Sequence, residues 1–194
     1  MIKSIDFYFD FISPYSYLAH KKIKLLKEKK NIIFNYKPIL VGGLHKLQGI
    51  TAPAFIEAKL KHMISDCNLI AEKNNFVFMW NSKFPIKSLN IMRGYLFIND
   101  AIKDTYLNLI FDAYWKDNLD VSNDDVLKTL LENYKIKSNE FLKGTKNPKI
   151  KDELKKITQE AHDMEIFGTP TFVVNSKIFW GQDRLEFALD EYNK

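Results

Sequence analysis

The stretch DFISPYSY at residues 10–17 decides how this chain folds. Residues 5–9 before it, IDFYF, are apolar and aromatic enough for a mostly buried strand. After it, apolar residues recur at helical spacing as far as Leu26. Ser13 is a good helix N-cap, and Pro14 suits the first helical position because its missing N–H needs no partner there. The sequence therefore predicts a strand, a short loop and a helix that begins next to Ser13.

The hydroxyl of Ser13 is thus expected at the positive end of a helix, beside backbone N–H groups that lack helical partners. Such a place stabilises an anion, including a thiolate. The simpler alternative is that Ser13-Pro14 only caps the helix. A serine-hydrolase site is excluded because the chain has no G-x-S-x-G turn, and a serine without a base is a poor nucleophile.

The longer stretch FDFISPYSYLA, residues 9–19, resembles the start of 2-hydroxychromene-2-carboxylate isomerases and of the related kappa-class glutathione transferases. These families form part of the DsbA-like branch of the thioredoxin superfamily. In the redox members of that branch the helix start carries Cys-x-x-Cys, and the matching positions here are Ser13-Pro14-Tyr15-Ser16. Because hydroxyls replace both thiols, dithiol redox chemistry cannot take place at this position. The resemblance implies a glutathione-dependent enzyme.

The composition is that of a globular protein without a membrane helix. Hydrophobic residues make up 46% of the 194 residues, and no apolar run of about 18 residues occurs. The N-terminus lacks the sustained apolar run of a signal peptide. The single cysteine, Cys67, cannot form an internal disulfide. We therefore expect a cytoplasmic protein that does not bind a membrane.

The net charge of +5 raises the question of nucleic-acid binding. The lysines are interleaved with acidic residues, as on solvated helix faces. Arginine occurs only as Arg93 and Arg184, whereas phosphate and base recognition usually depend on arginine. The histidines show no spacing typical of metal ligands. The sequence therefore predicts neither nucleic-acid nor metal binding.

The order of the expected elements indicates an α/β protein. Residues 31–40 are expected to form a second strand that ends at 41–43, so that strand, helix and strand make a parallel unit. Helical patterns follow, and then a hairpin at 171–180 and a C-terminal helix. The expected fold is a thioredoxin fold interrupted by an inserted all-helical domain, as in DsbA. Its parts are the first thioredoxin-like segment at 1–43, the helical domain at 44–165 and the second thioredoxin-like segment at 166–194.

A second stretch that carries the resemblance is FGTPTFVV, residues 167–174. In thioredoxin-like proteins the proline at this position is cis and faces the start of the active-site helix. The resemblance implies that the N–H and C=O of Thr169, before Pro170, are free to pair with the cysteinyl part of glutathione. The alternative is a trans proline that opens a strand.

The third stretch is WGQDR, residues 180–184. The resemblance implies that residues matching Gln182 and Asp183 hold the γ-glutamyl end of glutathione. That end carries an ammonium for the Asp183 carboxylate and a carboxylate for N–H groups at a helix start. The alternative role of Asp183 is helix capping, and Arg184 is expected to make a structural ion pair. The remaining cofactor-binding residues of this stretch are Trp180 and Gly181.

The residues expected to bind a substrate lie around Lys46. Isomerases of this family have a lysine that faces the substrate, followed by an Asn-Arg pair. The lysine matches Lys46, or His45 if the alignment moves by one position, but Ile50-Thr51 stands where the pair is expected. Lys46 is otherwise a solvated loop lysine. The resemblance also gives Phe84 a role as a wall of the substrate pocket.

The function that the resemblance implies is that of a glutathione-dependent isomerase, with Ser13 as the catalytic residue and glutathione as the cofactor. The substrate would be a small unsaturated or aromatic carboxylate of the ketoacid type. Two alternatives stay open: a kappa-type glutathione transferase, and a non-catalytic thioredoxin-like module that binds extended peptides. Because proteins of the family are homodimers, a homodimer is expected here as well.

Overall fold

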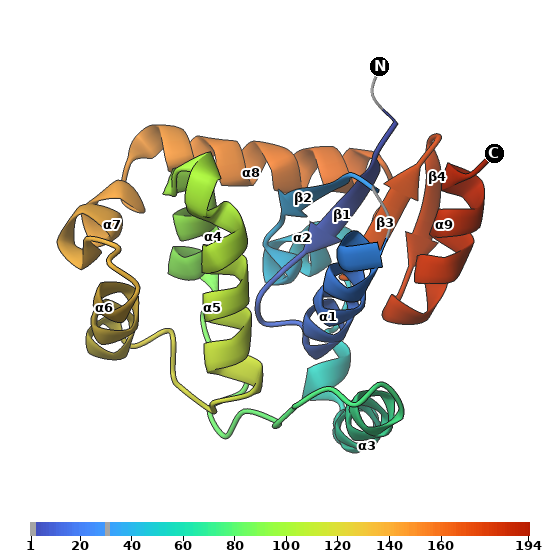
Figure 1. The fold of residues 1–194 in the computed structure, drawn as a ribbon, viewed down its shortest axis with the longest axis horizontal. Coiled ribbons are helices and arrows are strands. Elements are labelled where there is room, and N and C mark those ends of the chain that lie inside the picture. Colours follow the sequence, from blue (N-terminus) through green and yellow to red (C-terminus); the bar gives the residue numbers. More distant parts are fainter. Residues whose placement is uncertain (1–2, 30–31) are drawn as a thin grey trace.

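The computed structural model describes residues 3–29 and 32–194, and at its centre lies a four-stranded sheet in the order β2-β1-β3-β4 (Figure 1). β1 pairs with β2 in parallel, with Ile5 opposite Phe34, and with β3 antiparallel. The expected parallel pair is therefore confirmed. Residue 31, where the second strand was expected to begin, lies outside the described residues. The strands are β1 (Ile5–Phe9), β2 (Phe34–Pro38), β3 (Thr171–Val174) and β4 (Lys177–Trp180).

Helices occupy most of the chain between β2 and β3, as the sequence predicts. They are α1 (Pro14–Lys29), α2 (Val41–Gln48), α3 (Glu57–Lys73), α4 (Leu89–Phe97), α5 (Lys103–Trp115), α6 (Asp124–Asn133), α7 (Ser138–Gly144), α8 (Pro148–Asp163) and α9 (Leu185–Tyr192). Short 3-10 turns lie at Pro53–Phe55, Asp100–Ile102 and Gln182–Arg184. The chain thus runs strand, helix, strand, then helices, then hairpin and helix, which is the predicted α/β order.

The start of α2 differs from the expectation. The stretch at 41–43, predicted to end a strand, forms the first turn of this helix. The Asp10 carboxylate accepts the N–H of Val41 at 3.0 Å, and the Thr158 hydroxyl accepts that of Leu40 at 3.1 Å. These contacts satisfy N–H groups at the helix start, which outweighs the weak helix propensity of glycine. The expected domain boundary between residues 43 and 44 therefore lies within α2.

Both faces of β1 are covered, and alternate residues of this strand point to opposite sides. Phe7 and Phe9 enter a large aromatic core that contains residues of α1, α4, α5 and α9. Tyr8 points the other way and packs with Leu44 of α2 and Ala161 of α8. The strand is therefore buried on both sides, as its apolar sequence predicts.

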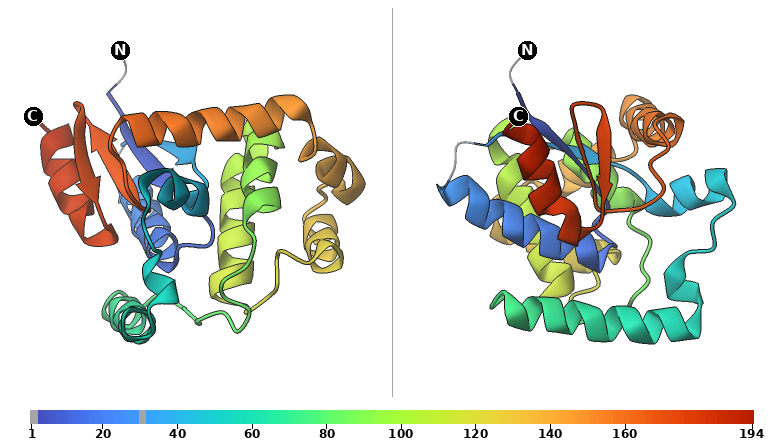
Figure 2. Two further views of the ribbon diagram at one scale, coloured as in Figure 1. Left: turned by 180° about the vertical axis from the view of Figure 1, so that it is seen from behind. Right: turned by 90° about the vertical axis from the view of Figure 1, so that its right-hand side faces the viewer.

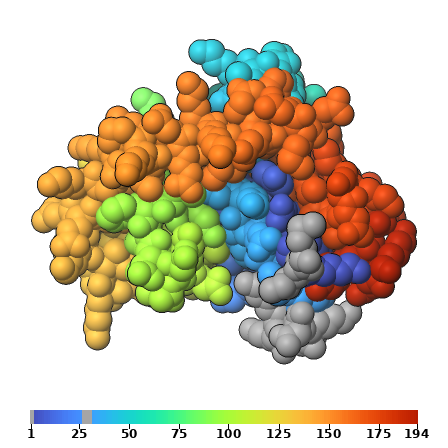
Figure 3. All heavy atoms as spheres, turned by 90° about the horizontal axis from the view of Figure 1, so that it is seen from above, coloured from blue at the N-terminus to red at the C-terminus, as the bar shows by residue number. Residues whose placement is uncertain are grey.

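The helical segment shares both of these cores with the sheet. α8 runs from α7 to the strands, across the top of the molecule in Figure 1, and Figure 2 shows it from behind. Seen from above, it stretches between α7 and the C-terminal hairpin (Figure 3). On the aromatic side, the ring of Phe111 in α5 lies 4.7 Å from that of Phe11, just after β1. The loop that leads to Ser13 thus rests on the helical segment.

Asp10 is a fully buried carboxyl that ties this loop to two helix starts. Its oxygens accept the N–H of Ile12 at 3.1 Å and of Val41 at 3.0 Å, and the Ser88 hydroxyl also bonds to it. Burial raises the pKa of the Asp10 carboxyl from 3.8 to about 6, although the hydrogen bonds lower it. The carboxyl therefore holds the segment before Ser13 in place relative to α2 and α4.

The raised pKa of Asp10 predicts a pH-dependent stability. Because the folded protein binds this proton more tightly than the unfolded chain, the carboxyl stabilises the fold fully below 3.8 and loses that contribution as the pH rises through about 6. The loss is on the order of 3 kcal/mol. The free energy of unfolding can be measured by urea titration for the wild type and for Asp10→Asn, which lacks the titrating carboxyl. We expect the difference, wild type minus variant, to fall by about 3 kcal/mol between about pH 4 and about pH 7. A difference that stays constant with pH contradicts this assignment.

The close packing of α4 predicts a second effect on stability. A Cβ on Gly94 would lie 2.1 Å from Cζ of Phe141 and 2.4 Å from the hydroxyl of Tyr106. Gly94→Ala should therefore lower the free energy of unfolding by about 1–3 kcal/mol. Gly42→Ala is the matched control, because a Cβ there meets no atom within 4 Å, and it should raise stability by up to about 1 kcal/mol. Equal midpoints in urea for the two variants would show that α4 is not tightly packed.

Candidate active site

Ser13 caps α1 as predicted. Its Oγ accepts the N–H of Ser16 at 3.2 Å, and its carbonyl accepts the N–H of Tyr17 at 3.2 Å. Its own N–H donates to the carbonyl of Asp10 at 3.0 Å, which closes the loop after β1. The residue is 8% exposed. The hydroxyl therefore lies at the N-terminus of α1, where the helix dipole is positive.

The Thr169-Pro170 bond is cis, as the resemblance implies, and its loop faces Ser13. Ser13 Oγ donates to the carbonyl of Thr169 at 3.0 Å, between residues 156 positions apart. The carbonyl oxygen therefore already accepts one of the two hydrogen bonds that a carbonyl can accept. The hydroxyls of Thr169 and of Ser16 are buried and find no partner among the described residues. Both residues belong to the segments that meet at Ser13, and their hydroxyls are buried polar groups without a protein partner.

The stretch after β4 is held against the cis-proline loop, which contains Thr169 and Pro170. The N–H of Gly181 donates to the carbonyl of Pro170 at 2.9 Å. Gln182 follows, only 8% exposed, and its Oε1 accepts a hydrogen bond from Lys22 of α1. The structure therefore brings Gln182, the cis-proline loop and α1 together. Sequence reasoning missed Lys22, because only the fold places α1 against this turn.

Asp183 lies next to Gln182 and is exposed. Its Oδ2 accepts a hydrogen bond from Nη1 of Arg184 at 2.9 Å, which confirms the expected ion pair of Arg184. The start of α9 has Arg184 as its N-cap and no side-chain cap hydrogen bond, so Asp183 does not cap this helix, contrary to the alternative. Since the pair is on the surface, it contributes little to stability and leaves the carboxylate accessible to a ligand cation.

Trp180 lies at the outer edge of the cis-proline loop. It is 52% exposed, and its ring centroid is 4.8 Å from that of Phe167. Its indole nitrogen is so close to Gly168 that a Cβ on this residue would lie 2.8 Å from it. Trp180 and Phe167 therefore form an exposed aromatic surface next to Thr169.

α2 brings His45, and not Lys46, into contact with the cis-proline loop. The imidazole of His45 hydrogen-bonds to the backbone of Phe167, and Gln48 Nε2 donates to the carbonyl of Ile166 at 2.9 Å. His45 Nδ1 is buried and has no partner in the described part of the chain. Burial lowers the pKa of His45, which favours the neutral ring. Lys46 is exposed on the same helix.

Phe84 belongs to an aromatic cluster behind the Ser13 loop. Its ring centroid lies 4.9 Å from that of Trp80 and 5.8 Å from that of Trp115. Trp115 Nε1 donates to the carbonyl of Phe11 at 2.8 Å, which fixes the cluster to the loop after β1. Phe84 is half-buried, so part of its ring is available as an apolar wall.

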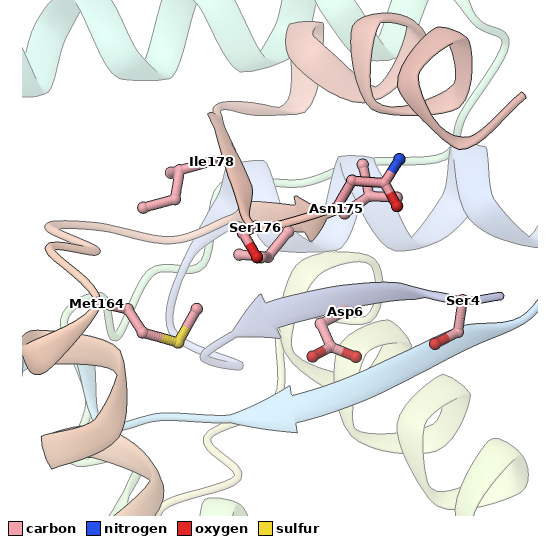
Figure 4. A pocket seen from close by; sticks show the side chains of 8 residues that line it. Ser4, Asp6, Met164, Asn175, Ser176 and Ile178 are labelled. Carbon is pink, nitrogen blue, oxygen red and sulfur yellow. The ribbon is translucent and has the colours of Figure 1, made fainter. Parts of the chain in front are cut away.

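A hollow of about 500 Å³ lies elsewhere, over the sheet between Asp6, Met164 and Ile178 (Figure 4). None of the predicted site residues lines it. The Asp6 carboxylate there accepts a hydrogen bond from Asn35 at 3.0 Å. Because Ser13 follows the opposite end of β1, this hollow is separate from the candidate active site.

The part of the chain that the structure describes holds neither a cluster of metal-ligating side chains nor a helix that could cross a membrane. Within residues 3–29 and 32–194, no three His, Cys, Asp or Glu side chains come together as a metal would need. Over the same residues, no helix has the length and apolar character to cross a membrane. Cys67 is buried in α3, and burial raises the pKa of its thiol, so it is not a reactive thiolate at neutral pH.

Comparisons with known proteins find relatives that match nearly the whole chain. The 2-hydroxychromene-2-carboxylate isomerase of Sphingobium xenophagum is 29% identical over 194 residues, which cover 99% of this chain and 98% of that protein. Glutathione S-transferase kappa 1 of Caenorhabditis elegans is 26% identical, over 96% of this chain and 89% of that protein.

Matches of similar extent are found with a solved structure and with a family model. A solved structure of 2-hydroxychromene-2-carboxylate isomerase matches with a TM-score of 0.87 at 22% identity, over 96% of this chain and 92% of that one. The family model of the DSBA-like thioredoxin domain matches residues 4–193. Since this match spans nearly the whole chain, the protein belongs to the DSBA-like thioredoxin domain family.

Proposed function

We propose that this protein is a glutathione-dependent isomerase that acts on a small unsaturated, aromatic carboxylate of the ketoacid type. The observation that carries the proposal is the Ser13 hydroxyl at the start of α1, 3.0 Å from the Thr169 carbonyl. A hydroxyl at this position can donate to a thiolate but cannot form a disulfide. The names of the relatives support a glutathione-related enzyme, since one is an isomerase and the other a glutathione transferase.

The residues around Ser13 fit glutathione. The cysteinyl part would extend along Thr169, whose own hydroxyl is buried and unpaired. The γ-glutamyl end would reach Gln182 and Asp183, a partly paired amide and an exposed carboxylate. Because Gly181 is hydrogen-bonded to Pro170, these two subsites are held side by side.

Ser13 would stabilise the sulfur as a thiolate. When bound, glutathione supplies a thiolate that adds to a conjugated carbon of the substrate and leaves after the former double bond has rotated. Lowering a thiol pKa from about 8.5 by two pH units takes about 2.7 kcal/mol. A hydrogen bond to a charged group contributes about 1.5–3 kcal/mol and a helix N-terminus about 0.3–1 kcal/mol. Ser13 and α1 together are therefore sufficient, provided that the hydroxyl turns from Thr169 to the sulfur.

The end of the proposed site that would bind the substrate has fewer polar groups than the end that would bind glutathione. Lys46 is the cation that we assign to the substrate carboxylate, and Phe84 provides an apolar wall. Ile50-Thr51 lacks the donors of an Asn-Arg pair. His45 is the alternative partner, but its lowered pKa favours the neutral form, which attracts a carboxylate less strongly.

The second candidate function is a kappa-type glutathione transferase, which the resemblance to the Caenorhabditis elegans protein favours. In that reaction the thiolate attacks an electrophile and stays attached. Assays of one preparation with chlorodinitrobenzene and with a hydroxychromene carboxylate separate the two enzymes. No turnover of either compound, together with binding of extended peptides, would favour a non-catalytic module.

Three further features are proposals that rest on the resemblance. They are a homodimeric assembly, a location in the cytoplasm, and a division of the chain into a thioredoxin-like domain and a helical domain. The buried, unpaired Cys67 supports the second, because no disulfide is needed for folding.

The role of Ser13 predicts a specific loss in Ser13→Ala. We expect turnover of the hydroxychromene carboxylate to fall at least about tenfold, because a hydrogen bond to a charged sulfur is lost. The pKa of the bound thiol, followed by thiolate absorbance, should rise towards that of free glutathione. Ser65→Ala, on the exposed side of α3, is the control and should change neither quantity. Unaltered thiol pKa in Ser13→Ala, or calorimetry without binding at millimolar glutathione, would contradict the proposed role.

The sparse substrate end predicts weak turnover that depends on Lys46. The wild type should convert the hydroxychromene carboxylate detectably but slowly, and Lys46→Ala should lower the rate by about ten- to a hundredfold. Lys59→Ala, an exposed lysine of α3, is the matched control. If His45→Ala lowers the rate and Lys46→Ala does not, the carboxylate partner is His45 instead.

A further inference from the structure

The half-buried Lys22 of α1 has an unusual partner for a lysine. Its ammonium donates to Oε1 of Gln182, a neutral amide 160 residues away, at 2.5 Å. Burial lowers the pKa of Lys22, and the nearby carboxylates of Glu186 and Asp183 oppose this effect. A lysine held in this way loses hydration without gaining a direct ion pair, so stability alone gives little reason for the contact.

The contact determines which end of the Gln182 amide faces a ligand. An ammonium group can only donate hydrogen bonds, so the amide oxygen has to face Lys22 and the amide nitrogen has to point away from it. Gln182 is 8% exposed, and its Nε2 has no acceptor among the described residues. An NH₂ group fixed in this way can donate a hydrogen bond to an acceptor on a ligand. It selects a carboxylate or a carbonyl and does not bind an ammonium.

The position of this donor relates it to the proposed cofactor. Gly181, the preceding residue, is hydrogen-bonded to Pro170, so the amide lies beside the cis-proline loop. The next residue, Asp183, presents an exposed carboxylate, which is an acceptor for a cation. A donor and an anion side by side match an amino-acid group, which carries a carboxylate and an ammonium on one carbon.

We propose that Lys22 is a positioning residue that holds Gln182 as a hydrogen-bond donor to the α-carboxylate of the γ-glutamyl group. This inference deepens the proposed function and rests on it, because glutathione is taken as the ligand. Lys22 does not touch the ligand. It acts by preventing the amide from turning over and presenting its oxygen.

The test is isothermal calorimetry with glutathione and with an analogue that lacks the γ-glutamyl α-carboxylate. Lys22→Met should weaken glutathione binding by about three- to tenfold, because the amide is then free to turn over. Lys22→Arg should restore the affinity, since a guanidinium also only donates. Lys24→Met on the same helix is the control and should leave the affinity unchanged.

Gln182→Glu gives the sharpest result because it keeps a hydrogen-bond acceptor for Lys22. It replaces the donor by an anion, so glutathione should bind about ten- to a hundredfold more weakly. The analogue should bind the wild type, Lys22→Met and Gln182→Glu with similar affinity. If the variants weaken the binding of glutathione but not of the analogue, Lys22 and Gln182 act on the α-carboxylate. A general structural role would weaken the binding of both ligands.

Three outcomes would overturn the inference. Tighter binding of glutathione to Gln182→Glu would show that Gln182 accepts from the ligand ammonium. Equal affinities for the wild type and Lys22→Met would show that Lys22 does not orient the amide. Either of these two results would still leave glutathione as the cofactor. The third outcome is that the wild type does not bind glutathione at millimolar concentration, which would contradict both the proposed function and this inference.

Discussion

The hydrogen bond from Ser13 to the carbonyl of Thr169 joins the start of α1 to the cis-proline loop, and the candidate site is built around it. It connects residues 156 positions apart, so it exists only when β1 and β3 are paired in the sheet. The same hydroxyl accepts the N–H of Ser16, which orients it at the positive helix end. One side chain thus serves both as a helix cap and as the donor that a ligand would recruit.

The packing around this contact explains how it stays in place. Asp10 joins the loop before Ser13 to the start of α2, and its burial raises its pKa at the expense of stability. Trp115 holds the same loop from the helical side through the carbonyl of Phe11. A buried carboxyl is a costly way to tie segments together, because burial disfavours its charged form.

The chemistry open to this site follows from what its residues can donate. Hydroxyls at Ser13 and Ser16 cannot exchange disulfides, and the thiol of Cys67 is buried elsewhere. Thiol chemistry at this site would need a sulfur from outside, and in the proposed function the amide of Gln182 and the carboxylate of Asp183 bind the amino-acid end of that ligand. The proposed enzyme therefore binds its nucleophile instead of carrying one.

The sequence by itself determined the elements whose causes are local. The cap at Ser13, the buried strand before it and the hairpin turn of β3 and β4 depend on residues next to one another, so they could be predicted. The tertiary structure alone decided that residues 41–48 form a helix, that His45 contacts the cis-proline loop, and that Lys22 donates a hydrogen bond to Gln182. Each of these depends on groups far apart in the chain, because hydrogen bonds and burial from distant segments override local propensity.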